Sequence, residues 1–133
     1  MCRIELRTEH GFLNGFVTDA DSPELLEYLS GQTNLAKAIV HELTVANRRV
    51  AILSDLHVDP DFRKRGAGSE LYSAFAERAE ALGAECYLLV VGCEIEEWDL
   101  EGWYERRGFM RTQIEADTGP LMAKPSSFAA QLS

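Results

Sequence analysis

The fold of this chain is decided by the stretch Leu56-His57-Val58-Asp59-Pro60-Asp61-Phe62-Arg63-Lys64-Arg65-Gly66-Ala67-Gly68. The extended run Arg49 to Val58 ends at Asp59-Pro60, because a proline cannot donate a ladder hydrogen bond. The two glycines after the basic residues lack a β-carbon, so their amides can approach a ligand closely. The stretch therefore predicts a strand, a basic loop and the start of a helix, in that order.

A helix and a second strand are predicted downstream of the loop. From Ser69 onward the apolar residues recur at intervals of three and four, and Gly83 stands where a helix would end. The run Cys86 to Val91 is too short for a typical helix and too apolar for an edge strand, which favours a buried central strand. Strand, helix and strand in succession predict a parallel crossover unit.

The sequence before the loop predicts two hairpins and a short helix. Ile4 to Leu6 and Phe12 to Val17 are apolar runs separated by a turn, as in a hairpin. Ser22-Pro23-Glu24 combines a cap residue, a proline and an acid before leucines at helical spacing. Ala38 to Val45 and the run from Arg49 suggest the second hairpin.

The C-terminal part returns to helix and then to strand. Leu100, Trp103 and Tyr104 mark one face of a helix that stops at Gly108. Two strand-like segments follow, Phe109 to Ile114 and Leu121 to Ala123. The mixed order predicts an α+β (mixed α/β) fold with one domain over residues 1–125 and a loose tail over residues 126–133.

Composition narrows the classes of function. The net charge is −9, from 13 Lys and Arg against 22 Asp and Glu, which would repel a nucleic-acid backbone. Three cysteines without ligand spacing argue against disulfides and against a metal site. With no apolar run that could span a bilayer, we expect a cytoplasmic protein that binds neither nucleic acid nor membrane. Arg106, Arg107 and Arg111 nevertheless lie close together, so a small anionic ligand has a positive site available.

Three phosphate-binding schemes compete for the loop. A Walker loop needs a lysine followed by Ser or Thr after its last glycine, where this chain has Ser69-Glu70. A dinucleotide fingerprint needs a third glycine where Leu71 stands. The third scheme is a basic residue or Gln, two variable residues, Gly, any residue, and Gly or Ala. Arg63 to Gly68 satisfies it in full.

In this loop the chain resembles the GNAT superfamily of N-acetyltransferases. The resemblance extends to Trp103-Tyr104-Glu105-Arg106-Arg107-Gly108-Phe109, which is similar to the family's Tyr-Glu-x-x-Gly-Phe segment, and covers about half of the chain. It implies a GNAT-like fold: a mixed, mostly antiparallel sheet with a splayed parallel strand pair, flanked by helices. It also implies acetyl-coenzyme A as cosubstrate, bound by Leu56, His57, Val58, Arg63, Lys64, Arg65, Gly66, Ala67, Gly68 and Ser69.

The resemblance implies direct transfer of acetyl to a primary amine of a small molecule or a protein, without a metal. Tyr104 stands where many members place the tyrosine that protonates the leaving thiolate. The amine must lose a proton, and Glu42 and Asp55 are the expected bases. His41 and His57 are further candidates on the same grounds, and none of the four residues matches a position of the family. A monomer and a homodimer both stay open, as does the alternative of a non-catalytic module that binds acyl-coenzyme A or a protein partner.

Overall fold

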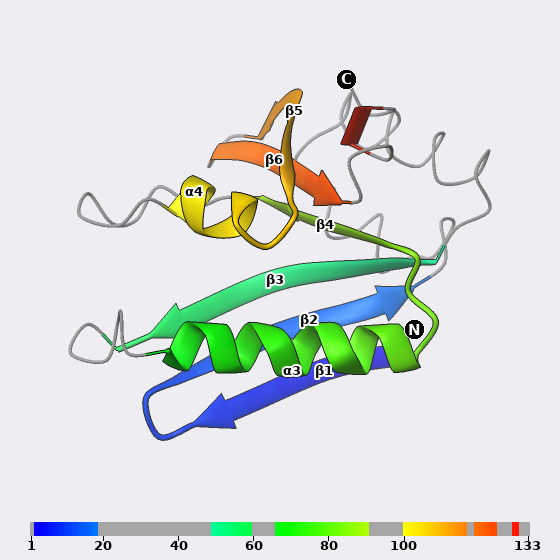
Figure 1. Cartoon of the computed structure of the whole chain (residues 1–133). Helices are drawn as coiled ribbons and strands as arrows, with labels where there is room; N and C mark the ends of the chain where they lie inside the picture. The colour runs from blue at the N-terminus through cyan, green and yellow to red at the C-terminus, as the bar shows by residue number, and fades with distance from the viewer. Residues whose placement is uncertain are drawn as a thin grey trace.

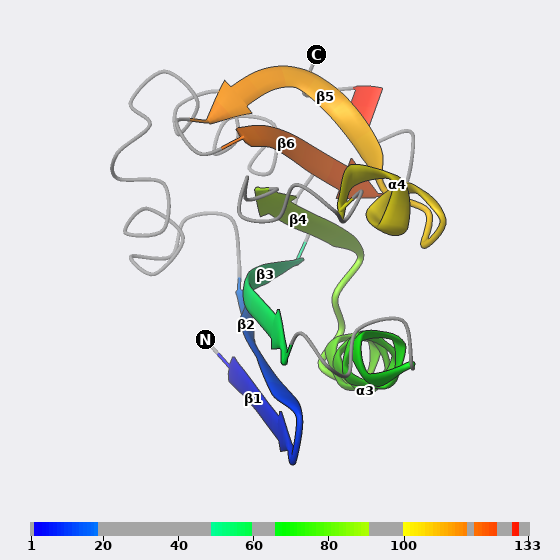
Figure 2. The same cartoon turned by 90° about the vertical axis from the view of Figure 1, so that its left-hand side faces the viewer.

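The computed structural model describes residues 2–18, 49–59, 66–90, 100–116, 119–124 and 129–130. Within these ranges six strands form one sheet, and two helices lie on the same side of it (Figures 1 and 2). The strands are β1 (Cys2–Thr8), β2 (Gly11–Thr18), β3 (Val50–Val58), β4 (Cys86–Val90), β5 (Met110–Ala116) and β6 (Gly119–Lys124). The helices, labelled as in Figure 1, are α3 (Ala67–Ala81) and α4 (Leu100–Glu105).

The sheet has the order β1-β2-β3-β4-β6-β5. Neighbouring strands are antiparallel except for β3 and β4, which are joined by the crossover through α3 and run parallel. This confirms the predicted mixed, mostly antiparallel sheet with one parallel pair. The predicted first hairpin is also confirmed, as β1 and β2 pair along their whole length with a turn at Glu9-His10.

The antiparallel neighbour of β3 is β2, a pairing that the sequence did not predict. The ladder with β2 runs along β3 from Val50 to Val58. Periodicity identifies a strand but carries no information on which strand lies beside it. The ranges 22–29 and 38–45 themselves lie outside the described residues.

The core lies between the sheet and the two helices. From α3, the side chains of Leu71, Tyr72, Phe75 and Ala79 are buried against it. Gly15 on β2 is required for this contact, since a β-carbon there would lie 2.6 Å from Cε1 of Phe75 and 2.5 Å from the backbone oxygen of Ile52. The missing side chain therefore lets α3 lie directly on the sheet.

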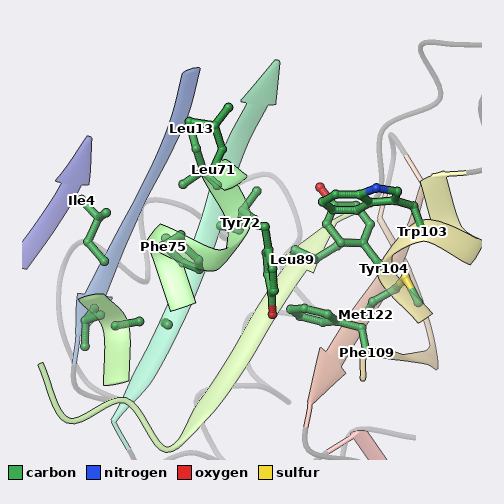
Figure 3. Close-up of a cluster of buried hydrophobic side chains, with 14 of the residues drawn as sticks. Ile4, Leu13, Leu71, Tyr72, Phe75, Leu89, Trp103, Tyr104, Phe109 and Met122 are labelled. Carbon is green, nitrogen blue, oxygen red and sulfur yellow. The ribbon is translucent and has the colours of Figure 1, made fainter. Parts of the chain in front are cut away.

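An aromatic cluster joins α3 to α4 and to the second half of the sheet (Figure 3). The ring of Tyr72 lies 6.1 Å from both Trp103 and Phe109, each in an edge-to-face arrangement. Tyr87 on β4 and Tyr104 on α4 also pack against Phe109. Such edge-to-face pairs contribute about 0.5–1.5 kcal/mol each beyond the area that they bury, so this cluster fixes α4 beside α3.

Tyr72 is the polar exception within this cluster. Its hydroxyl is buried and has no hydrogen-bond partner within the described part of the chain. Burial raises the pKa of Tyr72 well above its usual value. The ammonium of Lys124 lies 5.2 Å from the ring centre of Tyr72 and contacts the ring face, so it leaves the hydroxyl unsatisfied.

We predict that Tyr72→Phe raises the free energy of unfolding by about 1 kcal/mol, because it removes an unpaired buried hydroxyl and keeps the ring. Tyr87→Phe is the matched control, since the hydroxyl of Tyr87 donates to the carbonyl of Ala76 at 3.3 Å and its loss should destabilise by about 1 kcal/mol. Urea unfolding of the two variants measures both effects. A clear loss of stability in Tyr72→Phe would contradict the prediction.

Candidate functional site

The parallel strands β3 and β4 separate halfway along β3. Their ladder joins Val50 to Cys86 and continues only as far as the pair of Leu53 and Leu89, although β3 runs on to Val58. The ladder between β3 and β2 continues over that remaining length. Within the described residues, the last five positions of β3 therefore have a strand neighbour on one edge alone, which is the splayed pair that the resemblance implied.

A β-bulge lies at the point of separation. Asn14 pairs with Asp55 while its neighbour Gly15 pairs with Leu53, so Ser54 is an extra residue in β3. The hydroxyl of Ser54 donates to the carbonyl of Asn14 at 3.0 Å. Because the extra residue shifts the alternation of faces by one position, it changes which side chains point into the core.

The bulge keeps apolar residues of β3 against α3 along the whole strand. Before the bulge Ala51 and Leu53 are buried in the core, and after it Leu56 and Val58 pack there. Asp55 is exposed on the opposite face, next to the exposed Ser54. His57, which alternates with Leu56 and Val58, lies on that opposite face as well. Of the four predicted site residues in β3, Leu56 and Val58 therefore face the core, whereas Asp55 and His57 face away from it.

The N-terminus of α3 lies beyond the end of β3. Gly66 precedes the helix with φ at +87°, a conformation that costs other residues about 1–2 kcal/mol. Its carbonyl accepts the first helical hydrogen bond, from the amide of Glu70 at 2.9 Å, and among the described residues no side chain caps this end. The amides of the first turn, Ala67 to Ser69, have no acceptor inside the helix, so the helix end presents N–H groups and a partial positive charge to an anion.

The helix α4 is packed against this N-terminus through Trp103. A β-carbon on Gly68 would lie 3.4 Å from the Trp103 indole and 3.6 Å from Val58, so the three residues meet at one point. The guanidinium of Arg107 lies over the Trp103 ring, 3.4 Å from its centre. It donates to the Trp103 carbonyl at 2.9 Å and to the hydroxyl of Ser69.

Tyr104, the predicted proton donor, is buried beside Trp103. Its ring lies 5.0 Å from that of Trp103 and 5.7 Å from that of Phe109, both in edge-to-face arrangements. Figure 3 shows the rings of Trp103 and Tyr104 projecting from α4 toward Leu89, at the place where β4 parts from β3. The predicted acid is thus attached to the element that also contacts the α3 N-terminus.

The other predicted polar residues are divided between the outer face and the undescribed segments. Nε2 of His57 lies 3.4 Å from the carboxylate of Asp59, and its ring lies 5.5 Å from that of Phe12. Glu42 and the basic residues Arg63, Lys64 and Arg65 lie outside the described residues. No group of three or more His, Cys, Asp or Glu that could hold a metal occurs within the described ranges.

The sequence alone indicates Arg107 only as one of three neighbouring cations. The closeness of Arg106 and Arg111 in the sequence predicts a positive charge, but it does not predict where each side chain lies. In the structure, Arg107 and Arg111 contact different residues. Arg111 lies 3.5 Å from the carboxylate of Glu101, while Arg107 reaches the first turn of α3 at Ser69. Trp103, four residues earlier, is the one sequence signal for this arrangement, because a guanidinium can stack on an indole ring.

The sequence profile of the Acetyltransferase (GNAT) family matches residues 4–109, which include the bulged strand, the loop and the whole of α4. The matched range is far more than half of the chain. The chain therefore belongs to the GNAT acetyltransferase family, as its loop and its Tyr-Glu-x-x-Gly-Phe segment indicated.

Individual relatives agree with this assignment. The uncharacterized N-acetyltransferase YhfO of Bacillus subtilis (strain 168) is 37% identical over 76 residues, which cover 57% of this chain and 46% of that protein. This chain thus spans about half the length of that curated relative.

Solved structures share the fold at low sequence identity. The ribosomal-protein-S18-alanine N-acetyltransferase of Escherichia coli is 18% identical with a TM-score of 0.57, over 92% of this chain and 68% of that one. A chain of the NatC complex bound to Gag peptide and CoA is 13% identical with a TM-score of 0.58, over 86% of this chain and 60% of that one.

Proposed function

We propose that this chain is an N-acetyltransferase that moves the acetyl group of acetyl-coenzyme A directly to a primary amine. The observation that carries the proposal is the separation of β3 from β4 after Leu53, which leaves an open strand edge that ends at Val58, beside Gly68 in the first turn of α3. A thioester arm can lie in the gap between the strands while its phosphates reach the helix end. Membership of the GNAT family supports this use of the gap.

The coenzyme is held mainly by backbone groups in this proposal. The amides of Gly66, Ala67, Gly68 and Ser69 bind the diphosphate at the helix end, and the side chains of Arg63, Lys64 and Arg65 add positive charge. The backbone of Leu56, His57 and Val58 binds the pantetheine arm along the open edge of β3. A backbone contact is compatible with the buried side chains of Leu56 and Val58.

Tyr104 acts as the general acid. The amine nitrogen attacks the thioester carbonyl, the carbon–sulfur bond of the tetrahedral intermediate breaks, and the phenol gives its proton to the departing thiolate. A phenol has a pKa of about 10, whereas the thiol that forms has a pKa of about 8.5, so proton transfer from the phenol to the thiolate is thermodynamically unfavourable. Close positioning of the phenol beside the sulfur must therefore offset this difference. The rigid packing of Tyr104 between Trp103 and Phe109 supports that role.

Asp55 is our proposed base for the amine. Removing a proton from a lysine-like amine costs about 4.6 kcal/mol at pH 7, so a carboxylate near the thioester is useful. Asp55 follows the bulge, where the strands begin to separate, and is exposed on the face away from α3. An amine that approaches across this face meets Asp55 beside the gap. Glu42 stays a second candidate on sequence grounds alone.

The acceptor is an amine of a small molecule or of a protein. The fold neighbours include one named for the ribosomal protein S18 alanine and one bound to a peptide, so peptide amines belong in any screen. We also propose a cytoplasmic location, which the free thiols of Cys2 and Cys86 support. Within the described ranges, none of the helices has the length and apolar character needed to span a membrane.

The direct test is incubation with acetyl-coenzyme A and a panel of polyamines, aminoglycosides, lysine-containing peptides and peptides with free N-termini. The acetylated acceptor is detected by mass spectrometry, because Cys2 is exposed and would itself react in a thiol-release assay. We expect an acetyl adduct of at least one amine class. Coenzyme binding without any acetylated product would instead favour the non-catalytic binding module.

We predict that Tyr104→Phe lowers kcat by about a hundredfold, since loss of a general acid commonly costs about 10²–10⁴. The KM for acetyl-coenzyme A should stay unchanged, because the ring and its packing are retained. Steady-state kinetics and a melting curve separate the two effects. An unchanged kcat, or a fall in melting temperature that accounts for the loss, would show that Tyr104 only fills the core.

For Asp55→Asn we predict a fall in kcat of about a hundredfold with unchanged coenzyme affinity. Glu5→Gln is the matched control, because Glu5 pairs with Asn14, which pairs with Asp55, and all three lie in one row across the sheet. The control removes one negative charge from the same face and should leave kcat unchanged. Equal effects of the two variants would mean that Asp55 acts only through surface charge.

A further inference from the structure

Arg107 is held in one place by three independent contacts. Its guanidinium stacks on the Trp103 indole at 3.4 Å, donates to the Trp103 carbonyl at 2.9 Å and donates to the hydroxyl of Ser69. Ser69 belongs to the first turn of α3, which lies beside the end of β3 at Val58. The contacts therefore hold a fixed positive charge at the N-terminus of a fifteen-residue helix.

This placement is unfavourable for the protein on its own. The N-terminus of a helix carries about half a positive charge, so a cation beside it is repelled. No ion pair between described residues involves Arg107, in contrast to Arg111, which pairs with Glu101. Partial burial, and secondarily the neighbouring Arg106, lower the pKa of Arg107. An anion bound between the guanidinium and the helix amides would relieve each of these costs.

We propose that Arg107 is a coenzyme-binding residue, whose guanidinium donates to the diphosphate of coenzyme A at the first turn of α3. This inference rests on the proposed function and adds to it a side-chain contact from the turn that follows α4, outside the basic loop. The guanidinium donates one N–H group to Trp103 and one to Ser69, and it has further N–H groups that can bind another acceptor. Its planar fork of donors suits phosphate oxygens. Trp103 keeps that fork in place through the stacking contact and its carbonyl.

The arrangement also links the two halves of the site. Arg107 and Trp103 belong to the segment that carries Tyr104, and Ser69 belongs to the helix that receives the phosphates. A diphosphate held by both elements would fix the distance between the phosphates and the phenol. The role of Arg107 is therefore binding and positioning, while proton transfer stays with Tyr104.

The test compares Arg107→Met with Arg106→Met by isothermal titration with coenzyme A. Methionine keeps an apolar side chain against Trp103 and removes the charge, so the fold should be retained, which circular dichroism checks. Arg106 is adjacent, is exposed and carries the same charge, which makes it the matched control. We expect about a tenfold to hundredfold loss of affinity for Arg107→Met, the range for a charge-assisted hydrogen bond. The control should bind as the wild type does, and Arg107→Lys should recover part of the loss.

Two further ligands locate the contact. Dephospho-coenzyme A lacks the ribose 3′-phosphate, and pantetheine lacks both this phosphate and the diphosphate. Arg107→Met should weaken coenzyme A and dephospho-coenzyme A equally and leave pantetheine unaffected. A loss confined to coenzyme A would assign Arg107 to the 3′-phosphate and overturn the diphosphate contact.

Other outcomes are equally informative. A loss shared by pantetheine, or an equal loss in Arg106→Met, would reduce Arg107 to packing or to general charge and overturn the inference. If the wild-type protein binds no coenzyme A, the proposed function fails together with the inference. If the wild type binds it and Arg107→Met binds it equally well, the inference alone fails.

Discussion

The site depends on one local constraint, the extra residue Ser54 in β3. Without it, the alternation of a strand would turn Asp55 and His57 toward α3 and expose Leu56 and Val58. With it, apolar side chains face the helix both before and after the bulge, so the core continues while the ladder with β4 ends at Leu53. A single inserted residue thus keeps β3 in the core along its whole length, while its last five positions have a strand neighbour on one edge alone among the described residues.

The remaining elements are positioned by packing around that strand. Gly15 lets Phe75 bring α3 onto the sheet, and the helix then starts where β3 ends. The cluster of Tyr72, Trp103 and Phe109 fixes α4 against α3, which brings Arg107 to the first turn. The helix end, the open strand edge and the proposed acid are consequently held by one shared core.

Local patterns predicted much of the fold. Strand, helix and strand around the basic loop, the first hairpin and the ends of both helices near Gly83 and Gly108 were all visible as periodicity and glycine placement. The pairing of β3 with β2 was not predicted, because it joins segments that are distant in sequence. The bulge at Ser54 was not predicted either, because no residue type or pattern in the sequence of β3 indicates an extra residue.

The candidate site was predicted in part for a related reason. Residues Gly66 to Ser69 could be identified because a helix start has local signals, and the structure places them at the end of β3. The position of Arg107 depends on how α4 packs, which involves Trp103 and Gly68 from separate elements. Side chains whose role arises from packing between elements are therefore the ones that sequence patterns leave unassigned.

The most direct test of the account is a titration of the ¹⁵N-labelled protein with coenzyme A, followed through its amide signals. The central claim is that the coenzyme lies along the open edge of β3 and ends at the α3 N-terminus. The account predicts the largest shifts at the amides of Leu56, Val58 and Gly66 to Ser69, with small shifts along β1. Shifts centred on another part of the sheet, with the α3 N-terminus unchanged, would contradict it.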